Sequence, residues 1–205
     1  IRRQAHFGDE SEFFASLRAL NALERADVAG LVVDATQDFK RQEARLAHHA
    51  LDAGCSVLLI YNKWDLMSDR DATWKRLQEA RGDRYAMLAD LPAVPVSALE
   101  RTHLGRLPGL LQKRVTEHAR KLSTRQINDW LKLAQARRQP GSTRGGRAPR
   151  IYYATQTRSG PPEITLFVNE PSRLAENYRR YLWSHFTDHF GFTGTPVRLR
   201  VRRSD

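Results

Sequence analysis

Residues 62–65 read Asn-Lys-Trp-Asp and so place an amide, an amine and a carboxylate within four positions. The carboxylate of Asp65 can accept two hydrogen bonds, which matches the N1–H and the exocyclic amine of guanine. Adenine presents an acceptor and a C–H at the same places and would leave the carboxylate unpaired. The amide of Asn62 can donate to N7 of the base, and the aliphatic stem of Lys63 can cover the base plane.

A second short segment, residues 96–99 (Val-Ser-Ala-Leu), lies further along the chain and also follows an apolar run. There the backbone N–H of Ala98, beside Ser97, can donate to O6 of guanine. Four residues alone are a weak motif, but here the preceding strand, the spacing and the second loop coincide. Together they predict a guanine-binding site, and the alternative is an ordinary polar loop after a strand. The site residues are Asn62, Lys63, Asp65, Ser97 and Ala98.

Short apolar runs precede both segments and must position them. Residues 29–33, 56–61 and 93–96 are rich in Val, Leu and Ala, and their brevity is typical of buried strands. Patterns of helical spacing separate them, and Gly54 is the expected C-cap of the first. Alternating strands and helices predict a parallel α/β sheet, in which ligands bind at the carboxyl edge of the strands. The helical patterns are Phe13, Leu17, Leu20 and Leu23; Ala47, Ala50 and Leu51; residues 71–89; and Leu107, Leu110, Leu111, Val115 and His118.

The second half of the chain follows a different pattern. A helical stripe is followed by a Gly, Pro and Arg-rich loop over residues 137–150, and then by two strands that a Gly-Pro-Pro turn joins. A second helical face comes next, and in the last strand Val and Leu alternate with Arg. This order predicts a compact α-β-β-α-β unit. Its elements are the stripe Ile127, Trp130, Leu131 and Ala134; strands 151–155 and 164–168; the helix face over 174–186; and strand 197–202.

Charge also divides the chain. The formal net charge is +11, of which residues 1–122 carry +2 and residues 123–205 carry +9. So uneven a distribution indicates two domains with different partners, and a basic domain of this size favours a phosphate-rich polymer. A basic surface that only confers solubility is the alternative. No apolar stretch is long enough to span a bilayer, and the N-terminal residues do not resemble a secretory signal.

The motifs resemble the NKxD and SA motifs of translation-factor-class GTPases, and more of the chain resembles the Der (EngA) family. Residues 17–20, 24–28, 33–36 and 62–65 look like its second GTPase domain, and residues 152–156, 167–169, 178–182 and 190–196 like its C-terminal KH-like domain. The resemblance implies a partial P-loop GTPase domain over residues 1–122 and a KH-like domain over residues 123–205. It further implies GTP or GDP with Mg²⁺, hydrolysis of GTP, a ribosomal RNA partner in maturation of the large ribosomal subunit precursor, and a cytoplasmic location.

One part of the family pattern is not found. The sequence contains no GxxxxGK[ST] phosphate loop. The resemblance places that loop, the Mg²⁺ ligands and both switch segments upstream of Ile1. We therefore expect no catalytic residue in these 205 residues and no GTP hydrolysis by them alone. The alternative is a nucleotide-free RNA-binding or assembly module whose GTPase half is vestigial.

Several further residues could carry chemistry. Residues 191–194 match the GxxG of KH domains by letters, but their position between a helix and the last strand favours a structural turn. Arg198, Arg200, Arg202 and Arg203 are candidates for phosphate contact, with a solvated strand face as the alternative. Tyr152 and Tyr153 could stack on bases, although strand tyrosines more often pack within a protein.

Two remaining residue types favour structural roles. His185 and His189 lie four positions apart, a spacing that can bind zinc, but without a third ligand we expect core or surface histidines and no metal site. The only cysteine, Cys55, precedes an apolar run and is expected to be a buried thiol.

Overall fold

The computed structural model describes residues 18, 21–85, 88–141 and 148–204. The chain divides into two compact units, residues 1–115 and 116–205, which are described separately. The division falls slightly before the 122/123 boundary inferred from charge. The spacing of Phe13, Leu17 and Leu20 and the centre of the basic loop lie outside the described residues. Among those described, no helix combines the length and the apolarity that crossing a bilayer requires.

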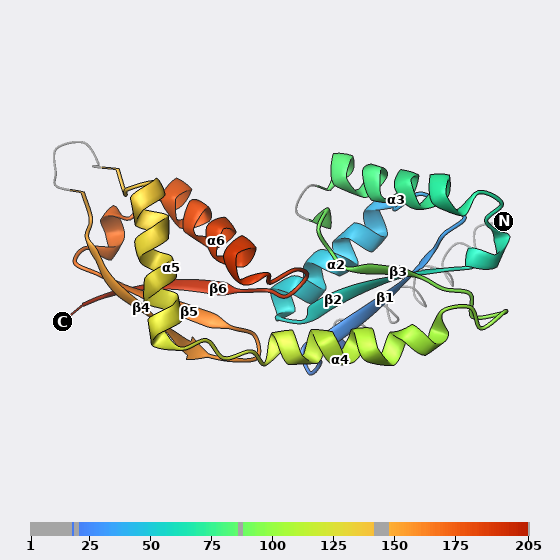
Figure 1. The fold of residues 1–205 in the computed structure, drawn as a ribbon, viewed down its shortest axis with the longest axis horizontal. Coiled ribbons are helices and arrows are strands. Elements are labelled where there is room, and N and C mark those ends of the chain that lie inside the picture. Colours follow the sequence, from blue (N-terminus) through green and yellow to red (C-terminus); the bar gives the residue numbers. More distant parts are fainter. Residues whose placement is uncertain (1–17, 19–20, 86–87, 142–147, 205) are drawn as a thin grey trace, which may run out of the picture. The chain divides into compact units, whose positions relative to one another are not determined.

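The first unit alternates strands and helices, and its sheet is parallel, as predicted (Figure 1). The strand order is β1-β2-β3. Pairing runs from Val28 beside Ser56 to Asp34 beside Asn62, so β1 and β2 end together. The elements are β1 (Val28–Asp34), α2 (Arg41–Ala53), β2 (Ser56–Asn62), η1 (Trp64–Leu66), α3 (Arg70–Arg84), β3 (Ala93–Pro95), η3 (Leu104–Arg106) and α4 (Leu107–His118).

Strand β2 is the centre of this sheet and is buried on both faces, as strands of parallel sheets usually are. Helices α2 and α3 cover one face and α4 covers the other (Figure 1). Val57, Leu59 and Tyr61 pack towards α2 and α3, whereas Leu58 and Ile60 pack towards α4. Because alternate side chains of β2 are buried against different helices, the strand is held in one orientation, and the start of the loop after it is fixed.

The sequence predicted the C-terminal end of α2 correctly, but not that of α3. Gly54 closes α2 in the left-handed conformation, with φ of 103°, which a glycine adopts without steric cost. The pattern over residues 71–89 predicts a helix that continues to residue 89, but α3 ends at Arg84. Leu88 and Leu91 are buried in the core, and the chain must leave the helix to place them there. In α4, the spacing predicts Val115 on the apolar face, but it is 39% exposed, whereas His118, predicted on the same face, is buried.

The second unit has the predicted α-β-β-α-β order. Its strands form a sheet of order β4-β5-β6, in which β4 and β5 are antiparallel and β5 and β6 are parallel. The elements are α5 (Thr124–Arg137), β4 (Ile151–Arg158), β5 (Glu163–Val168), η4 (Pro171–Arg173), α6 (Glu176–Phe190) and β6 (Arg198–Arg203).

Both helices of this unit pack on the same face of its sheet. The core joins Trp130 of α5 and Phe186 of α6 to every second residue of β5, namely Ile164, Leu166 and Val168. The alternation in β5 predicts an open face for the intervening residues, yet Thr165 is fully buried. Because β5 is the central strand, side chains of β4 and β6 cover it from both sides.

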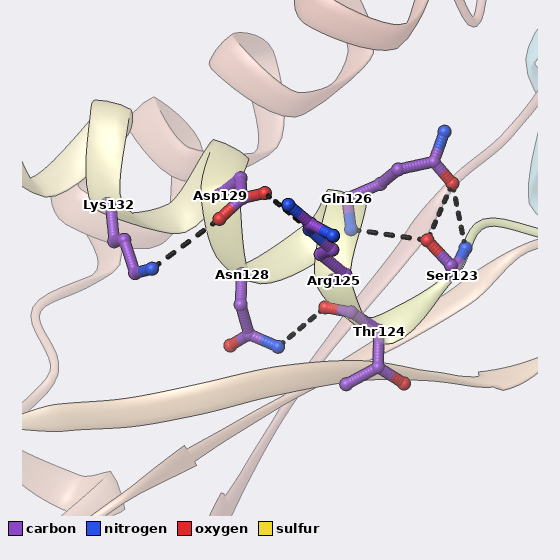
Figure 2. A network of polar contacts seen from close by, with 7 residues as sticks. All are labelled: Ser123, Thr124, Arg125, Gln126, Asn128, Asp129 and Lys132. Atoms are coloured by element: carbon purple, nitrogen blue, oxygen red, sulfur yellow. Dashed lines mark hydrogen bonds and ion pairs between the residues drawn. The ribbon is translucent and has the colours of Figure 1, made fainter.

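A capping box begins α5 (Figure 2). The Ser123 hydroxyl accepts the Gln126 backbone N–H at 3.3 Å, and the Gln126 side-chain oxygen accepts the Ser123 backbone N–H at 2.9 Å. Two backbone N–H groups that the helix leaves unpaired are thus satisfied. Asp129, one turn further on, forms ion pairs with Arg125 and Lys132 on the exposed side of the helix.

Candidate functional site

The predicted site residues gather where the strands of the first sheet end. The loop after β2 is bound to the segment after β3: the backbone N–H of Trp64 donates to the carbonyl of Val96 at 3.0 Å, and that of Val96 donates to the carbonyl of Tyr61 at 2.8 Å. On the other side of β2, the N–H of Ala35 donates to the carbonyl of Asn62 at 2.9 Å. Three loops therefore meet at the carboxyl edge of the sheet.

Asn62 is oriented by the loop that follows β3. Its Oδ1 accepts the backbone N–H of Ala98 at 3.0 Å. This bond fixes which way the amide points, so Nδ2 is the group available to donate. The structure therefore brings Asn62 and Ala98 together as predicted, but the Ala98 N–H bonds to Asn62 and does not point away from the protein. A base oxygen at this position would share that N–H with Asn62.

Asp65 is held by Ser97. The Ser97 hydroxyl donates to Oδ1 of Asp65 at 2.5 Å and accepts the backbone N–H of Glu100 at 3.0 Å. Ser97 is fully buried, whereas Asp65 is half-buried. Hydrogen bonds to a charged group are stronger than neutral ones, so the carboxylate is fixed and its other lone pairs are directed outwards.

Lys63 contacts a residue that we did not predict in the site. Its Nζ forms an ion pair with Oδ2 of Asp34 at 2.6 Å, and Asp34 is the last residue of β1. The N–H and hydroxyl of Thr36 donate to the other carboxyl oxygen at 2.9 and 2.7 Å. The hydrogen bonds from Lys63 and Thr36 lower the pKa of Asp34 to about 2. The polar residue that ends β1 was the sequence signal for this contact.

The backbone of Lys63 is in the left-handed region, with φ of 66°, which is uncommon for a residue other than glycine. Trp64 follows it and is 4% exposed. The Trp64 ring meets Trp74 of α3 edge to face, with the ring centroids 6.0 Å apart. The buried Trp64 anchors the loop in the core, so that the side chains on either side of it, Lys63 and Asp65, lie at the surface.

Other residues that the sequence marked have structural roles. The thiol of Cys55 is fully buried, donates to the carbonyls of Leu23 and Ala26, and has its pKa raised by burial, so the predicted structural role is confirmed. Gly191 ends α6 in the left-handed conformation and leads to the buried Phe192, as a structural turn should. The ring of His185 accepts a hydrogen bond from Nε1 of Trp130 at 2.9 Å.

Comparisons with known proteins identify the family of each unit. A family model described as the elongation factor Tu GTP binding domain matches residues 13–137. A second, described as the KH-domain-like of EngA bacterial GTPase enzymes, C-terminal, matches residues 121–202. The first unit is therefore part of a GTP-binding domain of the elongation factor Tu type, and the second unit is KH-like.

Individual relatives identify the family to which the whole chain belongs. The GTPase Der of Gloeothece citriformis is 38% identical over 199 residues, which cover 97% of this chain and 44% of that protein. The GTPase Der of Thermosynechococcus vestitus is 38% identical over 203 residues, which cover 98% and 45%. The chain belongs to the Der (EngA) family, and it spans less than half the length of these relatives.

Two solved structures are also similar to the chain. An Aquifex aeolicus Era variant bound to GDP and AlF4⁻ is 15% identical, with a TM-score of 0.41, and the match covers 90% of this chain and 67% of that chain. A probable GTP-binding protein, EngB, is 19% identical, with a TM-score of 0.40, and the match covers 56% of this chain and 68% of that chain.

Proposed function

We propose that the first unit recognises the guanine base of GTP and GDP through Asn62, Lys63, Asp65, Ser97 and Ala98. Asp65 accepts hydrogen bonds from N1–H and the exocyclic amine, Nδ2 of Asn62 donates to N7, and the N–H of Ala98 is shared between Asn62 and O6. The stem of Lys63, held at its far end by Asp34, covers the base plane. Ser97 positions Asp65.

The main support for this proposal is the pair of hydrogen bonds that orient the side chains of Asn62 and Asp65. Ala98 fixes the amide of Asn62, and Ser97 fixes the carboxylate of Asp65. A site preorganised in this way discriminates well, because a base with the wrong edge leaves buried polar groups unpaired. Sites of this kind reject an analogue that lacks the matching N–H groups by roughly 10⁴- to 10⁵-fold.

For the complete protein we propose GTP hydrolysis with Mg²⁺, coupled to ribosome biogenesis at the large-subunit precursor in the cytoplasm. Membership of the Der family supports the nucleotide and the ribosomal role. The net charge of +9 on residues 123–205 supports contact with RNA. Catalysis would require phosphate-binding and metal-binding groups in addition to the residues described above.

The test is a change of base preference in the product of the complete reading frame that encodes these residues. Asp65→Asn replaces a carboxylate with an amide, whose N–H can donate to the C2 carbonyl of xanthine while its oxygen accepts N1–H. We expect GDP affinity to fall by roughly 100-fold or more, because charge-assisted bonds are removed and the exocyclic amine meets a donor. XDP affinity should rise.

The matched control is Asp71→Asn, which makes the same chemical change at an exposed position in the first turn of α3. Both affinities are measured by displacement of a fluorescent nucleotide. The control should keep the GDP preference of the unmodified protein. If Asp65→Asn retains that preference as well, Asp65 does not read the base and the proposed site is wrong.

A further inference from the structure

In the described part of the second unit, both helices pack on one face of the sheet, and no helix covers the other face. Helices α5 and α6 pack on the face formed by Ile164, Leu166 and Leu199. Because successive side chains of a strand point to opposite sides, Glu163, Thr165 and Phe167 of β5 lie on the other face. The register places each of them beside an arginine of β6: Arg198, Arg200 and Arg202, respectively.

An aromatic pair lies at one end of this face. Tyr153 of β4 and Phe167 of β5 are paired across the two strands, and their rings stack with centroids 4.4 Å apart and an angle of 10° between planes. Tyr153 is nevertheless 41% exposed. One side of its ring contacts Phe167, and the exposed part of the ring offers a π surface to solvent.

Three of the four arginines of β6 make the same face basic. Arg198, Arg200 and Arg202 are all exposed and recur at every second residue. Glu163 is the acidic residue beside them; it is 9% exposed, and its carboxylate is bonded to Nε of Arg200 at 2.6 Å and to the hydroxyl of Thr157 at 3.0 Å. That carboxylate is therefore covered, while the guanidinium of Arg200 stays at the surface.

We propose that this face binds unpaired RNA, with a base stacked on Tyr153 and the backbone phosphates along Arg198, Arg200 and Arg202. The proposal deepens the RNA contact proposed above and does not depend on the guanine site. Aromatic rings accept any base and arginines accept phosphates, and together they form the usual platform for single-stranded nucleic acids. Bases within a duplex are already stacked and are not available to Tyr153.

The charge of the face decides between possible occupants. An apolar partner protein would remove water from this row of guanidinium groups without supplying negative charge, whereas a phosphate backbone supplies it at each step. Residues 191–194, which match the GxxG pattern by letters, lie between the end of α6 and the start of β6. Phe192 among them is buried in the core. The sheet face, and not that turn, carries the exposed ring and the row of arginines.

The experiment measures fluorescence anisotropy of a labelled single-stranded RNA, of the same RNA annealed to its complement, and of a labelled polyglutamate peptide. Tyr153→Val removes the ring from a strand position that suits valine. We expect it to weaken single-strand binding by about 5- to 150-fold, the range of one stacked base. Tyr152→Val, at the adjacent and similarly exposed Tyr152, should weaken binding much less.

A second variant, Arg198→Gln with Arg202→Gln, tests the phosphate contacts. The slope of log affinity against log salt should become shallower by about 0.7 for each phosphate that the protein no longer neutralises. Arg180→Gln with Arg125→Gln removes two exposed helix arginines as the control for net charge alone. Circular dichroism and thermal unfolding confirm that each variant is folded.

Three results would overturn the proposal. The first is equal affinity for the duplex and the single strand, and the second is unchanged RNA binding in both Tyr153→Val and the double arginine variant. The third is polyglutamate binding as tight as RNA binding and insensitive to Tyr153→Val, which would assign the face to an acidic protein. RNA affinity and GDP affinity are measured separately for Tyr153→Val and for the double arginine variant, so failure at the guanine site and failure at this face can be told apart.

Discussion

Asn128 of α5 closes the outer edge of β4, and its removal should destabilise the whole second unit. Its Oδ1 accepts the backbone N–H of Ala154 at 3.0 Å, and its Nδ2 donates to the carbonyl of Ala154 at 2.9 Å. Nδ2 also donates to the carbonyl of Thr124 at 2.7 Å (Figure 2). One side chain thus satisfies both backbone groups of a fully buried residue on an edge strand.

The expected loss in the free energy of unfolding follows from these hydrogen bonds. Asn128→Ala leaves the N–H and the carbonyl of Ala154 without their partner, at a cost of about 1–3 kcal/mol for each group. Alanine is the better helix former by roughly half a kcal/mol, and water can reach part of the opened edge. We therefore expect a net loss of about 2–4 kcal/mol in the free energy of unfolding of this unit.

Asn177→Ala is the matched control, because Asn177 lies on an exposed position of α6 and gains the same helix propensity. Its free energy of unfolding should change by no more than about 0.5 kcal/mol. Hydrogen exchange of the slowest core amides, such as that of Leu166, reports this unit separately from the first. In Asn128→Ala these amides should exchange roughly 30- to 700-fold faster, by the conversion of 1.4 kcal/mol per tenfold change.

Asn128→Asp separates the two bonds to Ala154. The introduced carboxylate keeps an acceptor for the N–H but faces the carbonyl without a donor, so near neutral pH it should be at least as destabilising as Asn128→Ala. Protonation restores an O–H donor, so stability relative to the unsubstituted protein should recover as the pH falls and the introduced carboxyl becomes protonated. Equal exchange rates in Asn128→Ala and Asn177→Ala would refute the assigned role of Asn128.

Two further predictions concern protonation. Lys63→Met should raise the pKa of Asp34 from about 2 towards its ordinary 3.8, as measured by carboxyl ¹³C NMR. Because the pKa of Asp34 is lowered in the folded state, the ion pair stabilises the fold above about pH 4, and this stability is lost as the pH falls towards 2. An unchanged pKa in Lys63→Met would contradict the ion pair. Burial and the charge of Arg137 lower the pKa of His185 below its ordinary 6.5, so the second unit should lose stability as the pH falls below 6.5. Urea midpoints at pH 7.5 and 5.5 should differ less in His185→Gln than in the unsubstituted protein.

The sequence predicted the order of elements because that order depends on local patterns. Runs such as residues 56–61 are apolar on both faces, and Val197, Leu199 and Val201 alternate with arginine, so strand positions were visible without tertiary information. Their meeting at one sheet edge followed from parallel topology. Asn62 and Ala98 accordingly lie together in the structure.

Contacts between distant residues were not predictable in the same way. The ion pair between Lys63 and Asp34 requires the aligned ends of β1 and β2, which only the register specifies. The bond from Ala98 to Asn62 competes with the base contact that we expected, and no residue pattern distinguishes the two. The burial of Thr165 depends on its place in the central strand, which the linear sequence does not give.

The central claim, that the first sheet edge recognises guanine, is tested most directly by comparing GDP with ADP. The product of the complete reading frame is loaded with a fluorescent guanine nucleotide, and each unlabelled nucleotide is titrated as a competitor. We predict a preference for GDP of roughly 10⁴-fold or more, because ADP would leave Asp65 unpaired. Comparable displacement by ADP, or no binding of either nucleotide, would contradict the account.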